Sequence, residues 1–111
     1  MNQDDIDWKG GHVRFWAMGS IDLDLPSKDQ EYLDEDLAIV EYPFGYVLDI
    51  GWYQGEFAVH IVNESTASVD CHPWFPPLFR EACDEPDQLI PLINKAVDLV
   101  IQFLMGVKGS E

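Results

Sequence analysis

The alternation of apolar and polar residues is clearest over residues 45–63, which read GYVLDIGWYQGEFAVHIVN. Two runs rich in β-branched and aromatic residues flank Gln54 and Gly55, a two-residue turn signal in which the glycine supplies a positive φ. If these two residues form the turn, the register of a β-hairpin is fixed, with Tyr53 opposite Glu56 and every later pair following in step. The pattern therefore predicts a hairpin.

The two faces of this hairpin differ in polarity, because successive side chains of a strand point to opposite sides. One face is entirely apolar and carries Leu48, Ile50, Trp52, Phe57, Val59 and Ile61. The other mixes polar and small residues and carries Asp49, Gly51, Tyr53, Glu56, Ala58 and His60. We expect a core face and a solvent face, with Asp49 directly opposite His60 on the latter.

Weaker patterns flank the hairpin. Residues 12–18 alternate with apolar side chains on both sides and predict a strand that is interior or covered. Residues 37–42 and 78–83 predict two further short strands. A capping-box pattern at Ser27 favours a loop or short helix over residues 27–35.

The C-terminal part predicts an amphipathic helix. It begins at Asp84-Glu85-Pro86-Asp87, with acidic residues and a proline in the first turn, and runs to about Met105 before Gly106. Its polar stripe is narrow, which indicates deep burial or an exposed apolar flank and leaves a homodimer open.

The predicted architecture is one α+β domain over residues 1–111: an antiparallel sheet of four to five strands, a central hairpin and a C-terminal helix packed on one face. Residues 1–10 are expected to be a loose lead-in.

The net charge of the chain restricts the classes of partner that it can bind. The chain has 21 acidic and 6 basic residues, a formal net charge of −15 at pH 7. Such a field repels nucleic acid and anionic membranes and attracts basic proteins. The acidic first ten residues do not resemble a secretory signal, and two cysteines are few for a secreted domain of this size. We expect a cytoplasmic protein that binds a basic protein partner, with no direct nucleic-acid or membrane contact.

The acidic residues are densest over residues 22–41, where eight carboxylates accompany Lys28 alone. The plain interpretation is a solvated surface, but concentrated like charges destabilise a fold and favour a role in electrostatic recognition. The carboxylates expected to steer a partner are Asp29, Glu31, Asp34, Glu35 and Asp36. Aromatic side chains near them are candidate interface anchors: Tyr32, Tyr53 and Trp74.

Asp49 and His60 are the strongest candidates for chemistry, since a carboxylate that orients an imidazole is half of a general-base device. No G-x-S-x-G motif supplies a nucleophile. The pair can therefore also be interpreted as a cross-strand contact that contributes at most about 1 kcal/mol to stability, or as a contact with a partner. A metal site from His12, His60, Cys71, His72 and Cys83 lacks the usual ligand spacing. We expect no catalytic residue, no metal and no cofactor.

The order of these pieces resembles small acidic bacterial immunity proteins: a hairpin GYVLDIGWY–turn–FAVHIV, a short PLFREAC segment and a closing amphipathic helix. Such proteins hold a cognate toxin of polymorphic or contact-dependent systems inactive in the producer's cytoplasm. The resemblance implies a non-enzymatic inhibitor of a basic toxin such as a nuclease. Two alternatives stay open: a DNA-mimicking inhibitor of a defence or restriction system, and a small hydrolase or ligand-binding domain that uses Asp49 and His60.

Overall fold

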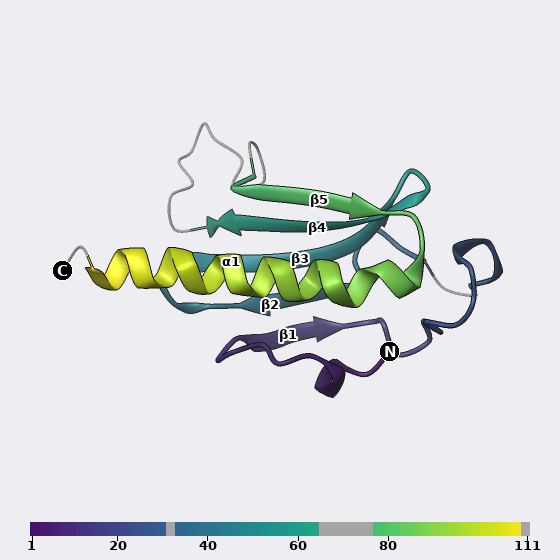
Figure 1. Ribbon diagram of the computed structural model, residues 1–111, viewed down its shortest axis with the longest axis horizontal. Coiled ribbons are helices and arrows are strands. Elements are labelled where there is room, and N and C mark those ends of the chain that lie inside the picture. Colours follow the sequence, from purple (N-terminus) through teal and green to yellow (C-terminus); the bar gives the residue numbers. More distant parts are fainter. Residues whose placement is uncertain (31–32, 65–76, 110–111) are drawn as a thin grey trace.

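The computed structural model describes residues 1–30, 33–64 and 77–109. These residues form one five-stranded antiparallel sheet and one long helix, as Figure 1 shows. The α+β architecture predicted from the sequence is confirmed. The strands and helix are β1 (His12–Trp16), β2 (Ala38–Glu41), β3 (Tyr46–Tyr53), β4 (Glu56–Asn63), β5 (Phe79–Cys83) and α1 (Leu89–Gly109).

The strands lie in the sheet in the same order as in the chain, β1-β2-β3-β4-β5. The central hairpin has the predicted register throughout, from Tyr53 opposite Glu56 to Tyr46 opposite Asn63. Its turn takes positive φ at both central residues, 52° at Gln54 and 90° at Gly55. That combination matches the right-handed twist of the flanking strands, which explains why a two-residue turn sets the register.

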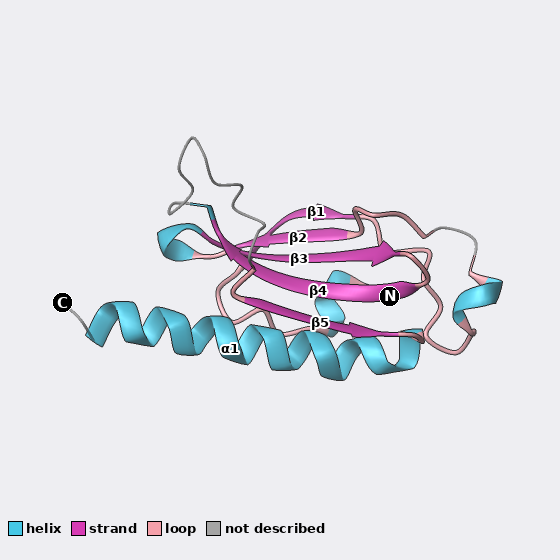
Figure 2. Ribbon diagram, turned by 90° about the horizontal axis from the view of Figure 1, so that it is seen from above, coloured by secondary structure: helices cyan, strands magenta, loops and turns pink. Residues whose placement is uncertain are grey.

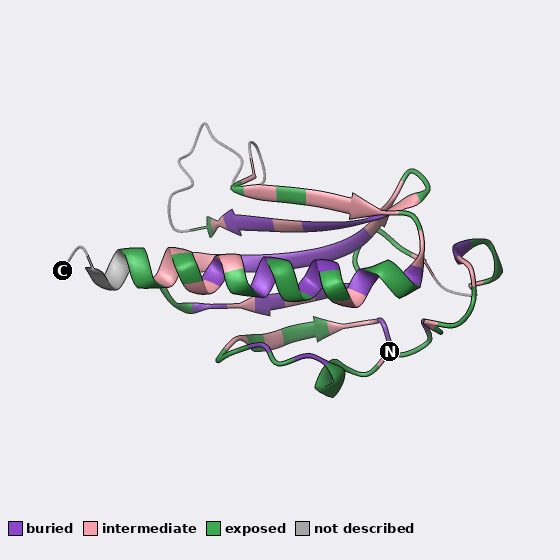
Figure 3. Cartoon of the chain, viewed as in Figure 1, coloured by how far each residue is buried: buried purple, intermediate pink, exposed green. Residues whose placement is uncertain are grey.

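The helix covers one face of the sheet, and the other face carries no helix in the described part of the chain (Figure 2). The core lies between α1 and the predicted apolar face of the hairpin. Its fully buried side chains include Leu48, Ile50, Phe57, Val59, Ile61, Leu89, Ile93 and Val100. The helix shows the matching pattern, with buried and exposed residues alternating by turn along it (Figure 3). The predicted core face is therefore confirmed.

The helical segment is longer than expected. A short 3-10 turn, η5 (Pro86–Gln88), precedes α1, and α1 continues past Gly106 to Gly109. A glycine ends a helix only where the backbone turns left-handed, and the helix continues through Gly106. By length and composition alone, Pro86–Gly106 could span a bilayer. In the folded chain, the face that carries Leu89, Ile93 and Val97 is buried against the sheet.

Two expectations about the N-terminal part are wrong. The first ten residues are not a loose lead-in, since Ile6 and Trp8 are buried in the core and the Tyr42 hydroxyl donates to the Trp8 carbonyl at 2.7 Å. Strand β1 is not interior but lies at the edge of the sheet, where Phe15 is 41% exposed. Its alternation is broken by a bulge between Val13 and Phe15, so apolar residues on both sides do not indicate a strand covered on both sides.

Candidate functional site

The sheet face opposite α1 carries two rows of polar side chains with a row of small residues between them. Pairing across β3, β4 and β5 aligns Asp49, His60 and Arg80 in one row. The next row toward the β3–β4 turn is Gly51, Ala58 and Ala82, and beyond it Tyr53 faces Glu56. Because alanine has a small side chain, the rows on either side border a depression at Ala58 and Ala82, whereas the space over Gly51 is taken by the Glu35 carbonyl and the Tyr53 ring.

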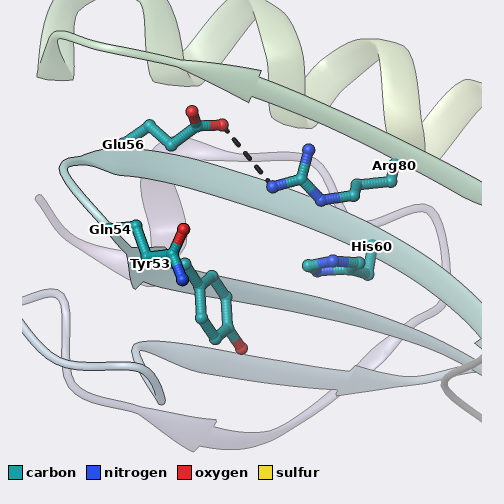
Figure 4. Close-up of a pocket in the computed structure, with 5 residues that line it drawn as sticks. All are labelled: Tyr53, Gln54, Glu56, His60 and Arg80. Atoms are coloured by element: carbon teal, nitrogen blue, oxygen red, sulfur yellow. Dashed lines mark ion pairs between the residues drawn. The ribbon is translucent and has the colours of Figure 1, made fainter.

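A pocket of about 460 Å³ lies at this position, lined by Tyr53, Gln54, Glu56, His60 and Arg80. Figure 4 shows the Tyr53 ring and the His60 ring on one side of the group and the Glu56–Arg80 pair on the other. The volume falls in the range of roughly 300–1,000 Å³ that is usual for ligand sites. The side chains are a mixture of one cation, one anion, two aromatic rings and an amide.

Asp49 lies beneath this group and is 2% exposed. Its Oδ2 accepts a hydrogen bond from the Tyr53 hydroxyl at 3.3 Å and lies 3.9 Å from Nδ1 of His60. The Tyr53 and His60 rings meet edge to face, with centroids 5.7 Å apart. The predicted pairing of Asp49 with His60 is confirmed, but the carboxylate is buried, so this face of the sheet is covered at that point and not open to solvent.

Burial shapes the protonation of the three groups. It raises the pKa of Asp49 to about 7, an effect that the Tyr53 hydroxyl opposes and the nearby Asp36 carboxylate increases. It also lowers the pKa of His60, with a further contribution from the Arg80 cation, and raises the pKa of Tyr53. At neutral pH the pair is therefore an imidazole held neutral beside a carboxyl that is partly protonated.

The acidic segment 34–36 is fixed against β3 beside this site. The Trp52 amide donates to the Asp34 carbonyl at 2.8 Å, and the Leu37 amide donates to the Ile50 carbonyl at 2.9 Å. Between these bonds the chain crosses Gly51, where any Cβ would collide with the Glu35 carbonyl. The absence of a side chain at Gly51 thus allows the segment to lie directly on the sheet.

Two further acidic segments converge on the same end of the sheet. The Ser27 amide donates to Glu85 Oε2 at 2.8 Å and its hydroxyl donates to the Asp84 carbonyl at 2.5 Å, which joins η2 (Ser27–Asp29) to the end of β5. In Figure 1, η2, the β3–β4 turn and the end of β5 all lie on the right. We call this region the acidic end; its carboxylates are Asp22, Asp24, Asp29, Asp34, Glu35, Asp36, Glu56, Asp84, Glu85 and Asp87.

The structure brings most of the predicted site residues together. Asp49, Tyr53 and His60 form the group described above, exposed Asp34, Glu35 and Asp36 adjoin it, and exposed Asp29 lies in η2 at the same end. The remaining predicted residues, Glu31, Tyr32 and Trp74, lie outside the described residues.

The sequence analysis missed Arg80 and Gln54 as site residues, and it did not connect Glu56, Asp84, Glu85 and Asp87 with the acidic run. The alternation of β5 was too short to give its register against β4, which is what places Arg80 opposite His60. The Ser27–Asp84 contact joins residues 57 positions apart, so no local sequence pattern predicts it.

The described part of the chain holds no group of three His, Cys, Asp or Glu side chains arranged for a metal ion. Of the residues weighed as metal ligands, Cys71 and His72 lie outside it. Cys83 carries a free thiol, whose pKa burial raises to about 11; a thiol so protonated at neutral pH is a poor nucleophile. None of the five side chains that line the pocket is a serine, threonine or cysteine.

Comparison with protein families, with curated proteins and with solved structures gave no match to this chain.

Proposed function

We propose that this protein is a non-enzymatic inhibitor that binds a basic protein partner through its acidic end. The supporting observation is that the acidic segment 84–87 meets segments 22–29 and 34–36, which are distant from it in the sequence, around one pocket-bearing end of the sheet. Of the residues described there, the basic side chains are Lys28 and Arg80, and Arg80 is paired with Glu56 at 3.5 Å. A one-signed surface next to a pocket raises the local concentration of a cationic partner and speeds association.

The partner class we propose is a bacterial toxin domain such as a nuclease. This part of the proposal draws on the resemblance to small immunity proteins and on the formal charge of −15. A nuclease carries a basic surface for its phosphate-rich substrate, and the acidic end would cover that surface. Inhibition would follow from occlusion, with the protein acting in the compartment where the toxin is made.

The acidic end supports a protein partner more readily than mimicry of a DNA duplex. A mimic needs carboxylates spread at regular spacing along an extended surface, because duplex phosphates repeat along the helix axis. Here the ten carboxylates of the acidic end gather at one end of the sheet, and the Asp49 carboxylate is buried.

The first prediction concerns steering by the acidic end. Replacing Asp34, Glu35 and Asp36 with lysine should slow association with the basic partner at least tenfold at low salt, since these carboxylates are exposed and belong to the acidic end. The partner is obtained by affinity capture from the native organism's lysate at low ionic strength, and rates are measured by surface plasmon resonance at several salt concentrations.

A matched control separates local from overall charge. Replacing Asp4, Asp7 and Glu64 with lysine changes the net charge equally, and these exposed residues lie outside the acidic end. That variant should associate within about threefold of the unchanged protein. Equal slowing in both variants would mean that total charge alone acts, and no slowing in either would refute steering by this surface.

A further inference from the structure

The pocket beside His60 is poorly suited to an anion despite the presence of Arg80. The Arg80 guanidinium is already paired with Glu56, with Nη2 3.5 Å from Oε2. The Tyr53 hydroxyl is turned to Asp49, and His60 is held neutral by burial and by Arg80. An anion in this pocket would therefore compete with Glu56 for Arg80 and with Asp49 for the Tyr53 hydroxyl.

The same pocket offers what a cation needs. Glu56 is 38% exposed at its rim, and a carboxylate accepts several hydrogen bonds at once. The edge-to-face rings of Tyr53 and His60 provide an aromatic wall. Burial is the main cause that raises the pKa of Tyr53, and the nearby Asp49, Asp36 and Glu35 carboxylates raise it further.

We propose that this pocket receives the guanidinium of an arginine side chain, which Glu56 binds and the Tyr53 ring stacks against. The inference rests on the proposed function, because the arginine would be presented by the basic partner. Arginine fits better than lysine, since its planar group pairs with both oxygens of a carboxylate and stacks on an aromatic face. Glu56 pairs with Arg80 through one oxygen only, Oε2 at 3.5 Å from Nη2, and a carboxylate has lone pairs enough to bind a second guanidinium beside it.

The test uses a capped amino acid in place of the partner. N-acetyl-arginine amide is titrated into the isotope-labelled protein, and the ring signals of Tyr53 and His60 are followed by NMR. We expect saturable shifts confined to the residues that line the pocket, with a dissociation constant in the millimolar range. N-acetyl-citrulline amide, which is nearly the same shape but uncharged, should cause no saturable shift.

Two protein variants complete the test. Glu56→Gln should weaken binding of the arginine probe at least fivefold. Glu81→Gln is the matched control, because Glu81 also forms an exposed ion pair, 2.7 Å from Lys95, but on the helix side of β5; it should bind as the unchanged protein does. Equal binding by both variants, an equal response to citrulline, or a stronger response to N-acetyl-glutamate amide would overturn the proposal.

The result of the arginine titration can be distinguished from the result of the test of the proposed function. If the arginine probe binds the pocket but no basic protein is captured, the inhibitor role falls while the cation pocket remains. If a basic partner is captured and steered by the acidic end but the probe fails to bind, the pocket inference falls alone. In both cases the unshifted amide signals outside the pocket report that the fold is intact.

Discussion

The buried Asp49 carboxyl, whose pKa is raised to about 7, destabilises the folded protein when it ionises above acidic pH. In the unfolded chain this group ionises near pH 4, whereas in the folded protein burial raises its pKa to about 7. Between those values the folded state holds more protons than the unfolded state, so the free energy of unfolding falls as pH rises. The size of the effect is on the order of 1 kcal/mol per pH unit within that window.

We therefore predict that Asp49→Asn stabilises the protein at pH 8 and has little effect at pH 4. Asparagine has the shape of the protonated acid and can still accept a hydrogen bond from the Tyr53 hydroxyl. Urea denaturation of both proteins from pH 4 to pH 8 gives the difference, expected to grow by about 1–3 kcal/mol over the window.

His60 contributes a pH dependence of opposite sign. Its pKa is lowered in the folded protein, so its contribution to stability is lost as pH falls below about 6.5, where the unfolded chain takes up the proton. Comparing Asp49→Asn with the unchanged protein largely cancels this term, since both keep His60. A difference between the two proteins that shrank with rising pH would contradict the assignment.

At the scale of elements, the hairpin and the strand-like segment 34–37 differ in how far the sequence predicts them. Turn chemistry and a two-residue period agree over residues 46–63, and each independently requires the same register. Segment 34–36 shows no such period, and its position depends on one missing side chain at Gly51 beneath Glu35. The position of Arg80 likewise depends on the pairing of β5 with β4, because the β5 pattern alone allowed several registers.

A substitution at Gly51 tests the anchoring of this segment. Gly51→Ala should displace the Glu35 backbone and break the Trp52–Asp34 hydrogen bond. The expected loss is about 1–3 kcal/mol in the free energy of unfolding, with faster hydrogen exchange at the Trp52 amide. Gly19→Ala is the control, since a Cβ there meets nothing within 4 Å, and it should leave both measurements nearly unchanged.

At the scale of the whole molecule, the described carboxylates gathered at the acidic end repel one another, and the few cations there do not balance them. Screening by salt weakens such repulsion over distances beyond about 10 Å at 0.1 M ionic strength. Raising sodium chloride from 20 mM to 500 mM should therefore raise the melting temperature by roughly 4–8 °C, which corresponds to about 1 kcal/mol.

The lysine variant at Asp34, Glu35 and Asp36 gives this prediction its control. With repulsion at the acidic end reduced, its melting temperature should rise by less than half as much over the same salt range. Differential scanning calorimetry measures both proteins under identical conditions. A fall in the melting temperature of the unchanged protein would mean instead that its exposed ion pairs, such as Arg14–Glu41, outweigh the repulsion.

The order of the strands has a consequence for how the protein is made. Because the sheet follows the chain from β1 to β5, each strand can add to the edge of its predecessor as it leaves the ribosome, with the short β2–β3 and β3–β4 connections closing fastest. The apolar face that carries Leu48, Ile50 and Phe57 has no helical cover until α1 is synthesised. The nascent sheet is thus most prone to aggregation just before the helix emerges, and translation of the helix is the step that ends this exposure.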